Sequence, residues 1–199
     1  MILSEVAPVP TGSLPTVLLR DHLRLGSGFA DDAVQDGLLA GQLRAALAAI
    51  EGLTGKAILA RQMRLVVHDW DGAAGLCLPV APVGSVQAVT LRDRTGAGSV
   101  LDPGSYWLRQ DAHVPAILPV AAYLPALPPG GSAEILFLAG WPDWAAVPPD
   151  LAQAVLLLAA HYHEQRHAAG EAGAPVPFGI GALVARWRRL RLTAGGGGQ

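Results

Sequence analysis

The stretch PPDLAQAVLLLAA, residues 148–160, decides the fold of this 199-residue chain. Proline is tolerated in the first turn of a helix, and the carboxylate of Asp150 suits the positive end of the helix dipole. From Leu151 to Ala160 the residues are apolar nearly all round, which predicts a central helix. The segment His161–His167 is its more polar end. Such a helix needs apolar partners, and the rest of the chain must supply them.

Two earlier segments carry the one-sided apolar pattern that can cover this central helix. The first is Leu14–Leu25, with Ser13 as a candidate N-cap. The second opens at Asp31 or Asp32, and Gly55 suits the C′ position at its end. Its apolar residues recur at three- and four-residue intervals: Val34, Leu38, Leu39, Leu43, Ala46, Leu47 and Ile50. We expect both helices to pack against the central helix.

After Lys56 the apolar period changes to two, which is typical of strands. Turn sequences such as Asp102-Pro103-Gly104 and Pro128-Pro129-Gly130-Gly131 separate the short alternating runs. The predicted strands are residues 63–68, Gly75–Leu78, Ser85–Arg92, Tyr106–Arg109, Val114–Leu118 and Ala133–Ala139. Short strands at this spacing predict a compact antiparallel subdomain.

Together these patterns predict an α+β protein, a small helical bundle with an inserted antiparallel β-subdomain and a mobile C-terminal helix. Residues 1–58 would form the N-terminal helices of the bundle, residues 59–146 the inserted β-subdomain and residues 147–170 the long bundle helix. Residues 171–199 would form a loop, the C-terminal helix and a flexible, glycine-rich tail.

Net charge and cysteine content exclude several classes of protein and of site. The formal net charge of −2 gives the chain as a whole no nucleic-acid-binding signature. Sparse charge suits a subunit that is buried on two sides. The single Cys77 excludes an internal disulfide and a cysteine metal site, and we expect it to be a buried apolar residue. The start of the chain lacks a signal-peptide pattern, and no apolar run reaches the roughly 20 residues that span a membrane. We expect assembly in the bacterial cytoplasm.

One motif suggests chemistry. Residues 163–167 read His-Glu-Gln-Arg-His, a literal H-E-x-x-H in which His163 and His167 could bind zinc and Glu164 could act as the base. The extended form of the motif needs a third ligand at position 173, which is Gly173. A short pattern in a histidine-rich helix also arises by chance, as a polar helix end. We therefore expect no metal, no cofactor and no enzyme activity, with a small zinc metalloprotease as the alternative.

The last predicted helix, from about Gly179 to Leu192, combines aromatic, apolar and basic residues and has no carboxylate. Mixed tryptophan and arginine is typical of interface anchors, although a solvated basic end is the plainer interpretation. The candidate docking residues are Ile180, Leu183, Val184, Arg186, Trp187, Arg188, Arg189, Leu190 and Arg191. Because the bundle would end near His167, we expect deletion of residues 179–199 to leave a folded core.

The order of motifs resembles the head–tail connector (adaptor) family of tailed phages and gene transfer agents. Three stretches carry the resemblance, and together they span about Leu14 to Leu192. They comprise His22-Leu23-Arg24-Leu25, Asp31-Asp32 and Glu51–Ala57; then Leu78–Val86, Val89-Thr90, Asp93, Leu101-Asp102-Pro103 and Tyr106; and finally Ala139-Gly140-Trp141, Val147-Pro148, Leu151, Leu156-Leu157-Leu158, Glu164, Arg166 and Pro177–Ile180. In this family Glu164-x-Arg166 is similar to a structural Glu-x-Arg, which leaves the histidines outside the pattern.

The resemblance implies a structural role in a virion or phage-like particle. Such proteins form a ring, commonly twelvefold, between the portal and the next connector or tail protein, and double-stranded DNA passes through the ring without sequence-specific binding. The C-terminal helix would dock into the portal, and side-to-side contacts would close the ring. We expect no membrane partner, and a free subunit that is monomeric. The second alternative is a generic β-rich binding module.

Overall fold

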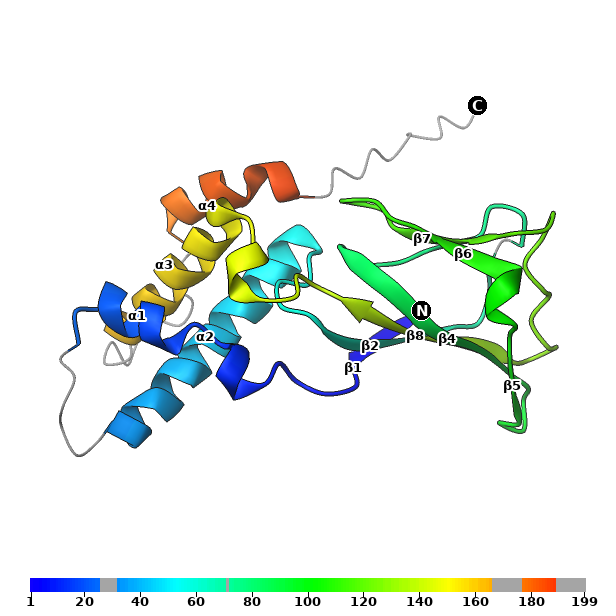
Figure 1. Cartoon of the computed structure of the whole chain (residues 1–199), viewed down its shortest axis with the longest axis horizontal. Helices are drawn as coiled ribbons and strands as arrows, with labels where there is room; N and C mark the ends of the chain where they lie inside the picture. Colours follow the sequence, from blue (N-terminus) through cyan, green and yellow to red (C-terminus); the bar gives the residue numbers. More distant parts are fainter. Residues whose placement is uncertain (26–31, 71, 166–176, 189–199) are drawn as a thin grey trace, which may run out of the picture.

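The structure is a computed structural model that describes residues 1–25, 32–70, 72–165 and 177–188. Figure 1 shows a helical lobe and a β lobe, arranged one after the other along the longest axis of the molecule. Each lobe has a hydrophobic core of its own. The predicted α+β class is confirmed. Among the described residues, no helix is long and apolar enough to cross a membrane.

The helical lobe is built around α3 (Pro149–Gln165), the helix predicted to be central. The helices that pack on it are α1 (Thr16–His22), α2 (Asp32–Thr54) and α4 (Phe178–Val184), and short 3-10 turns η1 (Thr11–Ser13), η3 (Trp144–Ala146) and η4 (Ala185–Trp187) complete the lobe. The buried residues of α3 are Leu151, Ala154, Val155, Leu158, Ala159 and Ala160. Full burial of one leucine or valine side chain contributes about 1.5–3 kcal/mol, so α3 stabilises this lobe together with α2, which buries Leu39, Leu43, Leu47 and Ile50 in the same core.

The helix ends follow the sequence signals in part. Gly55 directly follows α2 with a φ of +66°, and its N–H donates to the carbonyl of Glu51, which confirms the C′ prediction. The N-cap prediction for Ser13 is wrong, because Pro15 precedes α1 and makes no side-chain cap. A proline disfavours helical backbone at the preceding residue, and Leu14 is accordingly extended. The helix therefore begins only at Thr16.

The β lobe consists of two antiparallel sheets with a shared core between them. The larger sheet has the order β1-β2-β8-β4-β5 and the smaller one β3-β7-β6. The strands are β1 Ile2–Glu5, β2 Arg61–Val67, β3 Leu76–Cys77, β4 Val83–Arg92, β5 Gly98–Val100, β6 Tyr106–Arg109, β7 Ala116–Pro119 and β8 Ser132–Ala139, with the 3-10 turn η2 (Pro103–Ser105) before β6. In β2 the residues Met63, Leu65 and Val67 face this core, as their alternation predicts.

The structure has two edge strands that the sequence pattern does not predict. Strand β1 pairs with β2 in the register Ile2↔Val66, so the N-terminus belongs to the β lobe and not to the bundle. Strand β5 pairs with the end of β4. Each is too short for alternation to stand out, and both expose most of their side chains. An edge strand gains its order from its neighbour, which a local sequence pattern does not report.

The expectation that Cys77 is buried is wrong. Its side chain is exposed, whereas Leu76 and Leu78 on either side are buried. Successive side chains in a strand point to opposite faces, so two inward leucines turn the residue between them toward solvent.

An ion cluster joins the two lobes on one side of their junction. Arg61 of β2 is almost fully buried and contacts Glu51 of α2 through two nitrogens, at 2.9 and 2.6 Å. Its Nε donates to Glu5 of β1 at 2.9 Å. Burial lowers the pKa of Arg61, but the hydrogen bonds and charges of Glu51 and Glu5 raise it more, so the net pKa lies above its usual value. The guanidinium therefore stays charged and ties α2 to the sheet.

Candidate docking surface at the C-terminal segment

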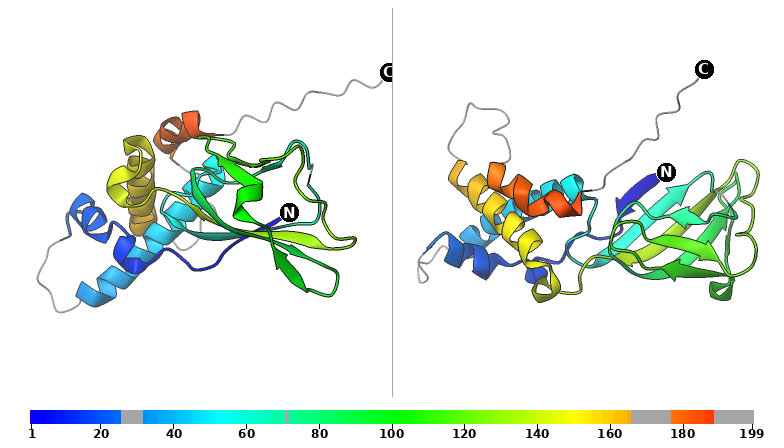
Figure 2. Two further views of the ribbon diagram at one scale, coloured as in Figure 1. Left: turned by 45° about the vertical axis from the view of Figure 1, so that its right-hand side comes forward. Right: turned by 90° about the horizontal axis from the view of Figure 1, so that it is seen from above.

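The apolar residues of the C-terminal segment are covered by their own subunit. Ile180 is 1% exposed and Val184 is 0% exposed, and both belong to the core of the helical lobe. Leu183 is partly buried and packs against the same core. Figure 2 shows α4 lying along the helical lobe and running toward the β lobe.

This packing corrects one expectation. The bundle does not end near His167, because α4 supplies two fully buried side chains to its core. Deletion of residues 179–199 would remove Ile180 and Val184 and expose the surface of α3 that they cover. The predicted amphipathic helix is right at its start, but it does not run on to Leu192: α4 ends at Val184, η4 follows and Arg188 is extended. Periodicity also does not identify which surface covers the apolar face.

Trp187 lies at the end of this segment, among residues from both lobes. Its indole Nε1 donates to Asp150 Oδ2 at 2.7 Å, and its ring meets Trp141 edge-on at 6.1 Å between centroids. The ring of His113, from the loop between β6 and β7, lies 6.4 Å away. The ammonium of Lys56 lies 5.8 Å from the centre of the indole ring. We call Trp187, Asp150, Trp141, His113 and Lys56 the Trp187 cluster.

The basic residues of the segment divide into an inner and an outer part. Arg186 stacks on the Trp187 ring at 4.7 Å and pairs with Asp150 through its Nε at 2.7 Å, although it remains largely exposed. Arg188 is exposed. Arg189, Leu190 and Arg191 lie outside the described residues. Arg188 is thus a predicted docking residue with an exposed side chain that is not paired with Asp150. It is available for contact with a partner.

Asp150 connects α3 to the C-terminal segment. Burial raises the pKa of its carboxyl, but hydrogen bonds from Trp187 and Arg186 and from the Leu151 N–H act in the opposite direction. The net pKa lies below its ordinary value. The carboxylate is therefore charged near neutral pH, as a partner for both Trp187 and Arg186 requires.

Lys56 and His113 are site residues that the sequence analysis does not identify. Lys56 is 1% exposed, its Nζ donates to the carbonyl of Ala112, and it lies 3.1 Å from His113 Nδ1. A buried ammonium needs such acceptors. A lysine just after a helix predicts a solvent-exposed side chain. No local sequence pattern indicates that Lys56 contacts a loop 56 residues further along the chain.

The described residues of the H-E-x-x-H motif do not form a metal site. His163 is partly buried, and its Nδ1 lies 3.1 Å from Gln42 Oε1 on α2, while Glu164 is exposed. His167 and Arg166 lie outside the described residues. Within the described parts of the chain, no three histidine, cysteine or carboxylate side chains come close enough to hold a metal.

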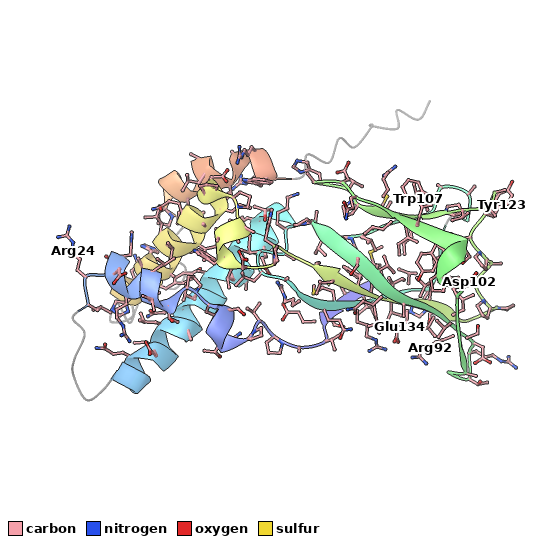
Figure 3. The ribbon with its side chains drawn as sticks, viewed as in Figure 1. Arg24, Arg92, Asp102, Trp107, Tyr123 and Glu134 are labelled. Carbon is pink, nitrogen blue, oxygen red and sulfur yellow. The ribbon has the colours of Figure 1, made fainter. Side chains whose placement is uncertain are left out.

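The β lobe presents a second surface with interface character. Trp107 and Tyr123 are 48% and 68% exposed, and Figure 3 shows both directed outward beside the smaller sheet. On the larger sheet, Glu134 accepts hydrogen bonds from Arg64 at 2.7 Å and from Arg92 at 3.1 Å. Hydrogen bonds from Arg92 lower the pKa of Glu134, burial raises it, and Arg64 lowers it further, with a net lowering. Exposed aromatic rings such as Trp107 and Tyr123 are typical of protein contacts, whereas the Glu134 ion pairs lie away from them on the larger sheet.

No protein-family model and no curated protein matches the chain. Solved structures match nearly its whole length. A chain in the neck of an empty gene transfer agent particle, computed with C6 symmetry, is 47% identical with a TM-score of 0.85, over 98% of this chain and 99% of that one. A chain in the virion of a native gene transfer agent particle is 46% identical, with a TM-score of 0.84 and the same coverage. A chain in the neck of a native particle, computed with C12 symmetry, is 43% identical, with a TM-score of 0.80 and the same coverage.

Similarity of this extent defines the class as a structural protein of a virus-like particle. More particularly, the chain belongs to the family of neck proteins of gene transfer agent particles, which are components of the virion. The family resemblance predicted from the ordered motifs is confirmed to that level.

Proposed function

We propose that this protein is the adaptor subunit of the neck, and that its copies form a closed ring between the portal and the next connector or tail protein. The observation that carries the proposal is the match, over 98% of the chain, to neck structures computed with C12 and C6 symmetry. Identical subunits in a closed ring make one repeated head-to-tail contact. Twelve copies would place double-stranded DNA on the ring axis, without sequence-specific contacts.

Two sets of exposed apolar residues support a side-to-side contact between subunits. One lies on α1, where Val17 and Leu18 are exposed, and the other on the β lobe around Trp107 and Tyr123. They lie on different lobes of the elongated molecule, so one subunit could present both sets to two different neighbours. A head-to-tail contact requires two such non-identical surfaces.

Docking to the portal is assigned to the C-terminal segment. Because Ile180 and Val184 are buried in their own subunit and Arg186 pairs with Asp150, we assign the docking contacts to Arg188, Arg189 and Arg191 at its end. Arginine forms bidentate hydrogen bonds with carboxylates, so an acidic portal surface is the partner that fits. Trp187 would hold the segment in place rather than enter the portal.

The test is capture of the protein by a purified portal assembly. A chain ending at Arg188 keeps the described contacts of α4 and η4 but lacks Arg189 and Arg191. We expect its affinity for the portal to fall at least about tenfold, as loss of two charge-assisted contacts implies. The full-length Arg188→Glu variant should weaken binding in the same direction.

Arg94→Glu is the matched control, because Arg94 is an exposed arginine on the β lobe, far along the chain from the docking segment. It should bind the portal like the unmodified protein. Equal capture of all four proteins would contradict the docking assignment. Failure of the unmodified chain to bind the portal at all would contradict the adaptor role.

A further inference from the structure

The C-terminal segment makes contacts that reach beyond the helix it packs on. Trp187 follows α4 in the helical lobe, yet its ring lies close to His113 of the β lobe. We propose that Trp187 is a positioning residue that locks the orientation of the β lobe relative to the helical lobe, and so couples the docking segment to the rest of the subunit. The functional part of this proposal rests on the proposed docking function.

On the helical side, three directional contacts hold the indole. Its N–H donates to Asp150 at the start of α3, its edge meets Trp141, and Arg186 stacks on its face. Aromatic and cation–π contacts of this kind have preferred geometries and so restrain the orientation of the ring. The ring is therefore fixed in position relative to α3 before any contact with the β lobe is counted.

On the β side, the contact runs through Lys56. This ammonium follows α2 and donates to Ala112 in the loop between β6 and β7, next to His113. The indole ring shelters the same ammonium at 5.8 Å. A buried cation loses stability when its surroundings open to water or shift away from its acceptors. Removal of the ring therefore weakens the attachment of the β6–β7 loop to the end of α2.

The ion cluster of Arg61, Glu51 and Glu5 is a separate connection between the lobes. It joins α2 to β1 and β2 of the larger sheet, whereas the Trp187 cluster joins α2 and α3 to a loop of the smaller sheet. Backbone hydrogen bonds of residues 55–60 with Ala81 and Trp141 hold the junction itself, and the two side-chain clusters restrict its angle from different sheets. Loss of the Trp187 contacts should therefore let the β lobe rotate more widely about this junction.

The distance between the lobes can be measured by pulsed electron spin resonance on the full chain. Cys77 is the sole cysteine and is exposed on the β lobe, and Val17→Cys adds a second exposed label site on α1. In this background Trp187→Ala should widen the label–label distance distribution about twofold, because a small interface leaves lobes free to move. His113→Ala should widen it as well, since it removes the β-lobe side of the contact and leaves α4 unchanged.

Trp187→Phe keeps an aromatic ring at this position but loses the hydrogen bond to Asp150. The label–label distance distribution should therefore stay nearly as narrow as in the Val17→Cys parent. Two controls separate orientation from local stability. Leu183→Ala loosens α4 against the helical core without touching the cluster, and Trp107→Ala removes an exposed tryptophan of the β lobe. Both should leave the distribution as narrow as in the Val17→Cys parent.

A distribution that stays narrow in both Trp187→Ala and His113→Ala, with circular dichroism showing folded protein, would overturn the proposal. Equal broadening by Leu183→Ala would also overturn it, because the effect would then be general loosening. The measurement needs no portal, so its outcome is independent of portal capture. Broadening together with absent portal binding would keep the lock and reject the docking function.

Discussion

At the level of single residues, buried charge is concentrated where the two lobes meet. Arg61 and Lys56 are both buried, and each reaches groups from the opposite lobe: Arg61 contacts Glu51 and Lys56 contacts Ala112. Apolar residues of similar size would give more stability at a buried site. The directional contacts of Arg61 and Lys56 instead define how the two lobes are oriented. A junction between two separate cores requires such a defined orientation.

The two carboxylates on Arg61 should differ in importance. Glu51 is mostly buried and bidentate, so Glu51→Gln should lower the free energy of unfolding by about 3–5 kcal/mol, as for a buried pair that loses one partner. Glu5 is more exposed, and Glu5→Gln should cost less than about 1 kcal/mol. Urea unfolding of the two variants measures both values. Equal losses would show that the ion cluster is not organised around Glu51.

The histidine motif leads to a prediction about metal content. His163 contacts Gln42, and position 173, where a third ligand would stand, is glycine. Since a catalytic zinc site needs three protein ligands, dialysed protein should hold far less than one equivalent of zinc. Atomic absorption measures the content, with His163→Ala as the comparison. Stoichiometric zinc that disappears in this variant would restore the metalloprotease alternative.

At the level of elements, two glycines should respond in opposite ways to alanine. Gly140 follows β8 with a φ of +112°, and a Cβ there would lie 2.5 Å from the backbone of Leu59. Gly140→Ala should therefore cost more than about 2 kcal/mol. Gly181 lies inside α4 with open space around it, so Gly181→Ala should add about 0.5–1 kcal/mol. Thermal unfolding distinguishes them, and a neutral Gly140→Ala would contradict the described junction.

Helix α4 leads to a second prediction at this scale. A chain ending at Pro177 lacks Ile180 and Val184, and loss of two buried side chains should cost about 3–6 kcal/mol. A chain ending at Arg188 keeps both and should unfold at the same denaturant concentration as the full protein. Equal stability of the two truncated chains would show that the packing of α4 on α3 contributes nothing.

The elements differ in how far the sequence predicts them. The apolar run of α3, the alternation of β2 and the glycine after α2 each decide local structure, and all three are confirmed. Strand β1 is four residues long and owes its order to β2, so local alternation is too weak to reveal it. The Trp187 cluster depends on contacts between distant segments, and Lys56 and His113 carry no local signal. The docking residues are predicted from composition and helical spacing, and neither shows that Ile180 and Val184 are buried in their own subunit.

For the whole molecule, we expect the free subunit to be a monomer. Each lobe already encloses a core, so folding does not depend on a second copy. Among the described residues, the exposed large apolar side chains are distributed over α1, α2 and the β lobe and are not confined to one element. Sedimentation at micromolar concentration should show mainly the 20.5 kDa species. A stable ring without any neck partner would contradict this.

The position of the β lobe within the chain has a consequence for synthesis on the ribosome. Helix α2 ends at Thr54 and its main partner α3 begins at Pro149, with the rest of the sheet between them. At about 5–20 residues per second, roughly 5–20 seconds pass before α3 exists to cover α1 and α2. The β lobe can close as soon as β8 has been made, because β8 is the central strand that joins β2 to β4. The nascent chain thus carries an uncovered leucine-rich helix through about half of its elongation, a period in which a chaperone such as a ribosome-bound holdase would find its substrate.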